Sequence, residues 1–202
     1  MPVKDAQTEQ LIKETAMRIF FVEGRLHATT QVIADEAGVN RGLIYYYFRS
    51  REVLFQEVFK EAMSVIHNRM QELFLSKNSI SFREKIGQFV ELFINQSIKY
   101  PYLEVFMITE ANRDDFTDPV DISLEMREQM KSNIGEDLKN EIKKGSIPEM
   151  PVEQFMINLV SLCAYPILFR PMLQHIMGMN NKAYWKMINE RKKLIMSVLF
   201  RD

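Results

Sequence analysis

The chain has 202 residues, of which 47% are hydrophobic and 26% are charged, and its formal net charge is −1. This balance excludes a disordered chain and a protein that coats nucleic acid through bulk positive charge. No apolar run approaches the roughly 18 residues of a membrane span, no apolar signal segment opens the chain, and Cys163 is the only cysteine. We therefore expect a cytoplasmic, globular protein without internal disulfides and without a membrane partner.

The first two predicted helices lie at the start of the chain. Residues 5–23 carry apolar side chains at helical spacing and stop at Gly24, the kind of residue that commonly follows a helix. Thr29 or Thr30 is expected to cap the second helix, because a threonine hydroxyl can accept a hydrogen bond from a free backbone N–H group. The first helix is expected to cover the two helices that follow it.

Residues 28–55 show the pattern of a helix-turn-helix. The small residue Ala34 stands four positions before Gly38. Two helices that cross steeply need a small side chain where they touch, and glycine readily takes the left-handed backbone of a sharp turn. Beyond the turn, Val39, Ile44 and Tyr47 are expected to seat the second helix of the pair on the first.

The outward face of this second helix suits a DNA groove. Asn40, Arg41, Leu43 and Tyr46 are expected to point away from the first helix of the pair. Residues 37–51 hold three arginines and no acidic residue, so the stretch carries a charge of +3 in an otherwise balanced chain. This charge is modest, and DNA binding must therefore rely on geometry as well as on charge.

The rest of the chain predicts further helices and no strand. A capping box at residues 81–84 marks one helix start, residues 113–120 form a polar loop, and Pro166 and Pro171 predict a kink or a break because proline lacks a backbone donor. The expected helical ranges are residues 50–74, 81–100, 102–112, 121–145, 152–177 and 181–200. The predicted fold class is all-α with about nine helices, in which a long fourth helix joins an N-terminal three-helix module to a C-terminal helical domain.

One run of residues resembles a known protein family. The pattern T-T-x-x-I-A-x-x-A-G-V-x-x-G-x-I-Y-Y-Y-F-x-S-R-E-x-L, from Thr29 to Leu54, resembles the DNA-binding module of TetR-family transcriptional regulators. The rest of the chain matches that family only in the number and length of its helices. The resemblance implies a helix-turn-helix DNA-binding domain over residues 1–50 and a ligand-binding and dimerisation domain over residues 51–202.

The resemblance also implies roles for individual residues. Thr30 and Arg51 match positions that bind backbone phosphates, although the family usually has lysine where Arg51 stands. Tyr47 matches a residue that touches phosphate, and the residues that commonly reach base edges are matched by Asn40, Arg41 and Leu43. The full expected DNA-binding set is Thr30, Asn40, Arg41, Gly42, Leu43, Tyr45, Tyr46, Tyr47 and Arg51. Arg49 is interpreted as a solvated side chain.

The function that the resemblance implies is a homodimeric transcriptional regulator, a repressor that a small-molecule effector releases from a palindromic operator in double-stranded DNA. In that family the last two helical segments pair in the dimer, and here these are residues 152–177 and 181–200. The effector pocket is expected in the C-terminal helices, with Phe106, Met130, Asn158 and Cys163 as candidate lining residues. The sequence does not identify the effector.

Two other classes of protein are weighed against this one. The first is a helical dimeric protein-interaction module that does not bind DNA. The second is a small-molecule-transforming enzyme, but the chain has no nucleophile motif and no glycine-rich phosphate loop, so no catalytic residue and no cofactor are predicted. The three histidines and Cys163 lack metal-ligand spacing, so no metal site is expected either.

Overall fold

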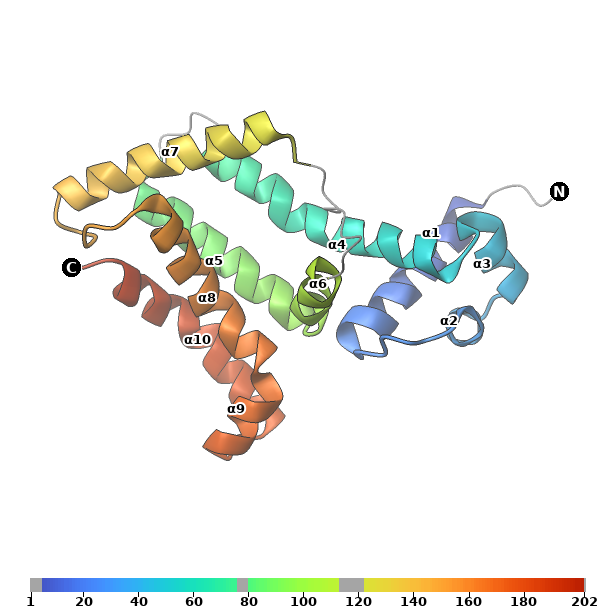
Figure 1. The fold of residues 1–202 in the computed structure, drawn as a ribbon. Coiled ribbons are helices and arrows are strands. Elements are labelled where there is room, and N and C mark those ends of the chain that lie inside the picture. The colour runs from blue at the N-terminus through green and yellow to red at the C-terminus, as the bar shows by residue number, and fades with distance from the viewer. Residues whose placement is uncertain (1–4, 76–79, 113–121, 202) are drawn as a thin grey trace. The chain divides into compact units, whose positions relative to one another are not determined.

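The computed structural model describes residues 5–75, 80–112 and 122–201 (Figure 1). Within these ranges the chain is helical and contains no strand, which confirms the all-α class. The expected polar loop at residues 113–120 lies outside the described residues. The helices are α1 (Ala6–Met17), the π-helix η1 (Arg18–Val22), α2 (Thr30–Ala37), α3 (Arg41–Phe48), α4 (Arg51–Phe74), α5 (Phe82–Lys99), α6 (Leu103–Ala111), α7 (Leu124–Lys143), α8 (Val152–Leu168), α9 (Arg170–Met177) and α10 (Asn181–Leu199).

The segment from residue 152 to 177 forms two helices, as its prolines predicted. Pro166 lies inside α8, Pro171 lies in the first turn of α9, and the two helices bend by 72° at Phe169. This break brings the α-helices in the described chain to ten, one more than expected. None of the described helices is long and apolar enough by itself to cross a membrane. Helices α8 and α9 taken together would be long and apolar enough, by length and composition only, but they are separated by their 72° bend.

The chain divides into two compact units, each with its own core. Unit 1 comprises residues 1–65 and 99–120, and unit 2 comprises residues 66–98 and 121–202. Helix α4 contributes its first part to unit 1 and its last part to unit 2. Helix α6 belongs to unit 1 although it is distant in sequence from α1–α3.

An aromatic cluster fills the core of unit 1. Phe20 and Phe21 of η1 meet Phe55 of α4 with ring centroids 5.3 and 6.1 Å apart, and Phe106 of α6 lies 5.4 Å from Phe21. The three consecutive residues from Ile19 to Phe21 are fully buried. The i→i+5 hydrogen bonding of a π-helix adds one residue to the turn, and this helps three successive side chains to enter one core.

The start of α6 packs against the chain at Gly24, just after η1. The Tyr102 N–H donates to the Phe21 carbonyl over 3.0 Å, and this contact places the Tyr102 ring against Gly24. A Cβ atom added at Gly24 would lie 2.7 Å from that ring, and Gly24 also has a φ of +69°. Glycine is therefore required here for its backbone conformation and for its size.

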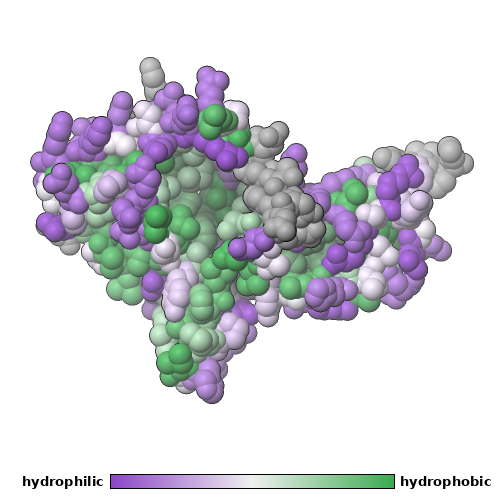
Figure 2. All heavy atoms as spheres, in the orientation of Figure 1, coloured by the Kyte–Doolittle hydropathy of each residue, from purple (hydrophilic) through white to green (hydrophobic). Residues whose placement is uncertain are grey.

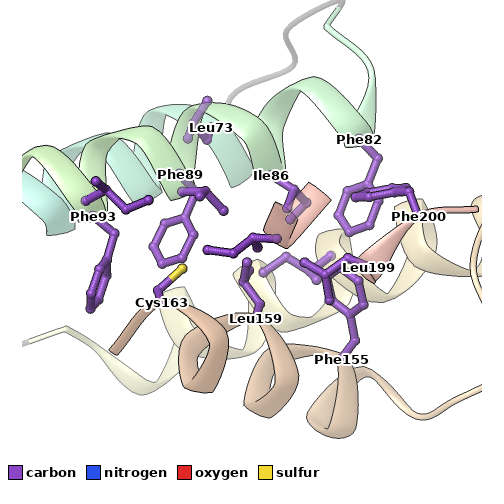
Figure 3. Packing of buried hydrophobic residues seen from close by; sticks show 14 of the residues in the cluster. Leu73, Phe82, Ile86, Phe89, Phe93, Phe155, Leu159, Cys163, Leu199 and Phe200 are labelled. Carbon is purple, nitrogen blue, oxygen red and sulfur yellow. The ribbon is translucent and has the colours of Figure 1, made fainter. Parts of the chain in front are cut away.

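The core of unit 2 joins α5, α8 and α10. Figure 3 shows Phe82 of α5 between Phe155 of α8 and Phe200 at the end of α10, with centroid separations of 5.5 and 6.2 Å. The hydroxyl of Tyr184 in α10 donates to the carbonyl of Pro166 over 2.6 Å. That carbonyl belongs to the last turn of α8, where helical partners run out. Burial raises the pKa of the Tyr184 hydroxyl, so it stays protonated as a donor.

Substitution of Gly24 by alanine should destabilise unit 1 more than the same change at Gly38. Both glycines have nearly equal φ, +69° and +67°, but nothing lies within 4 Å of a Cβ added at Gly38. Gly38→Ala should therefore cost only backbone strain, about 1 kcal/mol, and Gly24→Ala should add a steric cost of about 1–3 kcal/mol. Denaturant unfolding of both variants measures the difference. Equal losses would show that the Tyr102 ring yields freely.

Candidate nucleic-acid interface and ligand pocket

The turn between α2 and α3 fixes the position of α3. Thr29, rather than Thr30, caps α2, because its Oγ1 accepts from the Val32 N–H over 3.3 Å. Gly38 ends α2 in the left-handed conformation, and the fully buried Ala34 accepts a hydrogen bond from the Val39 N–H at 3.0 Å. The roles predicted for Ala34 and Gly38 are therefore confirmed.

Helix α3 has one buried face and one exposed face. Ile44 and Phe48 are buried against the unit 1 core, and Leu43 is partly buried. Arg41 and Tyr45 lie one turn apart on the exposed face, where Tyr45 is 67% exposed. Tyr45 is thus the most open of the three consecutive tyrosines, whereas Tyr46 was expected to be the outward one and is half-buried.

Two of the predicted DNA-contact residues also shape α3 itself. The Asn40 Oδ1 accepts from the Gly42 N–H over 2.7 Å, so Asn40 is the N-cap of α3. A Cβ atom at Gly42 would lie 3.0 Å from that same oxygen. The small size of Gly42 therefore leaves room for the cap, and both residues remain exposed at the start of the helix.

Arg41 and Thr30 lie together. The Arg41 Nε donates to the Thr30 Oγ1 over 3.2 Å, so the start of α2 and the start of α3 form one polar surface. Arg41 contacts no carboxylate among the described residues, and it carries its positive charge at the exposed end of α3. This surface is the place where a phosphate or a base edge can approach.

Tyr47 joins α3 to the beginning of the chain. Its hydroxyl accepts from the Asp5 N–H over 3.0 Å and lies 3.2 Å from the Asp5 carbonyl, to which it can donate. Asp5 in turn caps α1. The Tyr47 hydroxyl therefore already has partners within unit 1, and its ring packs edge-on against Tyr46 at 5.2 Å.

Arg51 is directed into unit 1. Its Nε donates to the Ala28 carbonyl over 2.8 Å, its Nη2 donates to the Leu26 carbonyl, and its guanidinium lies 5.2 Å from the centre of the Phe20 ring. The side chain is 27% exposed. These bonds hold the connector between η1 and α2 against the start of α4. Two of the three guanidinium nitrogens thus donate to the protein's own backbone, and the third, Nη1, lies 3.9 Å from the Glu52 carboxylate.

An ion-pair network fixes α2 to η1. Glu36 of α2 binds Arg18 and Arg25, each over 2.5 Å, and Glu23 binds the same two arginines. Hydrogen bonds from Arg18 and then Arg25 lower the pKa of Glu36. The network is therefore complete near neutral pH and is lost as the pH falls through the carboxylate range, because protonation of Glu36 removes its charge.

Unit 2 contains an apolar cavity of about 320 Å³ between α4, α7 and α8. Its walls include Met70, Met130 and Met156, and the ion pair between Lys131 and Glu153, 2.7 Å long, also lines it. A larger hollow of about 690 Å³, beside the ion pair of Lys85 with Asp137, has mainly polar walls. Small-molecule sites are mostly apolar with a few placed polar groups, which favours the smaller cavity.

The four candidate pocket residues lie in different surroundings. Met130 lines the apolar cavity, Cys163 is buried in the core of unit 2, and Asn158 is exposed on α8. Phe106 belongs to the aromatic core of unit 1. Burial raises the pKa of the Cys163 thiol to about 12, so this cysteine is an inert core residue near neutral pH. No group of three metal-ligating side chains occurs in the described ranges.

Comparison with known proteins places the helix-turn-helix in a family. A protein-family model described as "Bacterial regulatory proteins, tetR family" matches residues 12–58, which run from α1 into α4. The HTH-type transcriptional regulator YhgD of Bacillus subtilis is 26% identical over 140 residues, which make up 69% of this chain and 71% of that protein. The family-model match includes the surface described above.

Solved structures share the whole fold. The ketosteroid transcriptional regulator KstR2 of Mycobacterium tuberculosis superimposes with a TM-score of 0.68 at 16% identity, over 100% of this chain and 98% of that one. FadR of Bacillus subtilis, solved in complex with stearoyl-CoA, gives a TM-score of 0.58 at 18% identity over 94% of this chain and 98% of that one. The N-terminal module thus matches the tetR family of bacterial regulatory proteins, the curated relative is a transcriptional regulator, and the solved structures share the fold of the whole chain.

Proposed function

We propose that the protein is a dimeric repressor that a small molecule releases from a near-palindromic operator. The observation that carries the proposal is the polar surface formed by the half-buried Thr30 and the exposed Asn40, Arg41 and Gly42 at the starts of α2 and α3. In a helix-turn-helix the N-terminal part of the second helix reaches base edges in the major groove. This protein therefore acts by binding DNA in the cytoplasm and not by catalysis.

Each part of the surface has its own role in the proposal. Arg41 reads a guanine through paired hydrogen bonds once its bond to Thr30 exchanges for the base, and Thr30 then binds a phosphate. Leu43 contacts a thymine methyl group, and Asn40 reads a neighbouring base with the amide group that its cap leaves exposed. Residues 1–50 thus form the DNA-binding domain.

Around these contacts, the tyrosines of α3 approach the sugar-phosphate backbone. Tyr45 is the most exposed of them and lies beside Arg41 on the helix surface, so its hydroxyl is the most accessible donor for a phosphate. Tyr46 and Tyr47 flank it, and Gly42 allows the backbone of α3 to come close to DNA. Tyr47 also holds α3 against the start of α1 through the hydrogen bond between its hydroxyl and the Asp5 N–H.

We propose that residues 51–202 supply dimerisation through α8–α10. Nine exposed large apolar side chains lie there, and Figure 2 shows apolar surface over the lobe that carries α9. They are Ile157, Val160, Tyr165, Phe169, Met172, Ile176, Met177, Leu194 and Val198. Exposed apolar side chains gathered on neighbouring helices are typical of an interaction surface. A two-fold dimer presents two copies of α3 to successive major grooves about 34–36 Å apart, which requires a near-palindrome.

The effector proposed for the cavity of unit 2 is an apolar or amphipathic molecule. Three methionines give that cavity an adaptable apolar wall, and the ion pair of Lys131 with Glu153 adds charged groups to its lining. The structural relatives include a regulator solved with stearoyl-CoA, an amphipathic molecule with a long acyl chain, and a regulator named for ketosteroids. A coupling of about 1–3 kcal/mol between effector and DNA is enough to release the operator.

Selection of bound genomic fragments with purified protein tests the proposed function against a DNA-independent interaction module. A regulator should enrich near-palindromic fragments, and its affinity for them should fall steeply between 50 and 200 mM salt because phosphate contacts release counterions. Failure to enrich any sequence, or an affinity that salt leaves unchanged, would favour the interaction module.

Substitution of Arg41 by alanine should relax base preference at one position in each half-site. The lost guanine contact is worth about 1–3 kcal/mol of discrimination, whereas binding to unrelated duplexes should change little. Affinities for a panel of operators with single base changes measure this. An unchanged preference at every position would remove Arg41 from the reading residues.

Substitution of Val198 by aspartate should separate the dimer. Val198 is 67% exposed on α10, and a buried unpaired charge at an interface costs several kcal/mol. Leu124→Asp is the matched control, because Leu124 is 72% exposed on α7 outside the proposed interface. Sedimentation equilibrium should find the Val198 variant monomeric and the control dimeric. A dimer that survives the first change, or dissociates with the second, would place the interface elsewhere.

A further inference from the structure

The six lysines and arginines in residues 5–58 differ in what they contact. Lys13 lies within 4.0 Å of Glu9, Glu57 and Glu61. Arg18 and Arg25 are bound by the two glutamates of the ion-pair network described above. These three cations are therefore neutralised locally, and they add little to the attraction of a phosphate backbone.

Three arginines remain, and they are not equivalent. Arg51 donates hydrogen bonds from Nε and Nη2 to the Ala28 and Leu26 carbonyls. Arg41 contacts only the hydroxyl of Thr30, and Arg49 is exposed with no side-chain partner among the residues that the structure describes. Of the positive charge in residues 37–51, Arg41 and Arg49 thus carry the part that is open to a ligand.

The backbone at Arg49 is unusual. Arg49 has a φ of +67° and a ψ of −43°, and within the described ranges no other residue except glycine has a positive φ. The Ser50 N–H donates to the Phe48 carbonyl over 2.7 Å, which closes a γ-turn around Arg49. A γ-turn with positive φ is rare and strained, and such strain persists where the surroundings impose it and often where function uses it.

The surroundings of this turn hold it firmly. Phe48 on one side is 1% exposed, and Leu54 in the first turn of α4 is fully buried. The Ser50 Oγ accepts from the Val53 N–H over 3.2 Å and begins α4. Glycine would adopt this backbone without strain, so an arginine here lowers the stability of the fold. What arginine adds in exchange is its charged side chain.

We propose that Arg49 makes the phosphate contact at the end of α3, and that Arg51 instead positions the connector before α2. The proposal rests on the DNA-binding function. When α3 lies in a major groove, the turn that follows it is close to the sugar-phosphate backbone, where a mobile exposed guanidinium binds without regard to base sequence. Arg51 acts on DNA binding indirectly, through the start of α2.

Replacement of Arg49 by glycine separates the side chain from the backbone. The variant R49G keeps the turn and relieves its strain, so its denaturation midpoint should equal or exceed that of the wild type. It should bind every duplex more weakly. Each lost phosphate contact lowers the slope of log K against log salt by about 0.9, so a dimer loses about 1.8. Between 50 and 200 mM salt, the wild type should therefore lose roughly tenfold more affinity than R49G.

Two further variants complete the test on a duplex selected from genomic fragments. R49K keeps the charge and should retain the wild-type slope. R51K keeps the charge but cannot reproduce the forked bonds to two carbonyls, so it should lower the denaturation midpoint and leave the slope unchanged. An unchanged slope in R49G, or a reduced slope in R51K, would overturn the assignment. A wild-type protein that selects no duplex would overturn the DNA-binding function and the Arg49 contact with it.

Discussion

The position of α3 depends on the short backbone turn after α2. Ala34 is fully buried where the two helices meet, and Gly38 turns the chain in the left-handed conformation. Asn40 then starts α3 three residues after α2 ends, so little freedom remains between the helices. The surface of Thr30, Arg41 and Tyr45 exists because of this turn, and each proposed contact with DNA inherits its direction from it.

Charge pairing within unit 1 limits what one copy of the module can do. Four of the six lysines and arginines in residues 5–58 are bound by glutamates or by backbone carbonyls, which leaves Arg41 and Arg49 open. The whole chain carries a formal charge of −1, so no bulk attraction compensates for this. Because so few cations are open to phosphate, we propose that specific binding uses two copies on one duplex, joined through the exposed apolar residues of α8–α10.

Local signals in the sequence predicted much of the fold. Glycine at a helix end, a threonine cap and two prolines act within a few residues, and the α2–α3 turn and the α8–α9 break appear where those signals lie. The all-α class followed from the helical spacing of apolar residues, and the family was indicated by the resemblance of the pattern from Thr29 to Leu54. The effect of such residues on helix starts and ends depends on their immediate neighbours along the chain, so it can be predicted from the sequence.

Contacts between segments far apart in the sequence could not be predicted from such local signals. Arg51 has the charge and the position of a phosphate ligand, but its direction depends on carbonyls 23 and 25 residues earlier. The Tyr47 hydroxyl is bound by a residue 42 positions away. The cavity of unit 2 is formed by α4, α7 and α8 together, so no single stretch of sequence indicates its walls, and Met130 alone among the four candidates lines it.

Hydroxyl-radical footprinting on a selected operator tests the central claim most directly, because it reports where both modules of a dimer lie. The account predicts two protected half-sites related by two-fold symmetry, with centres one helical turn, about 34–36 Å, or a multiple of it apart. A single protected site, or protection without symmetry, would contradict the account.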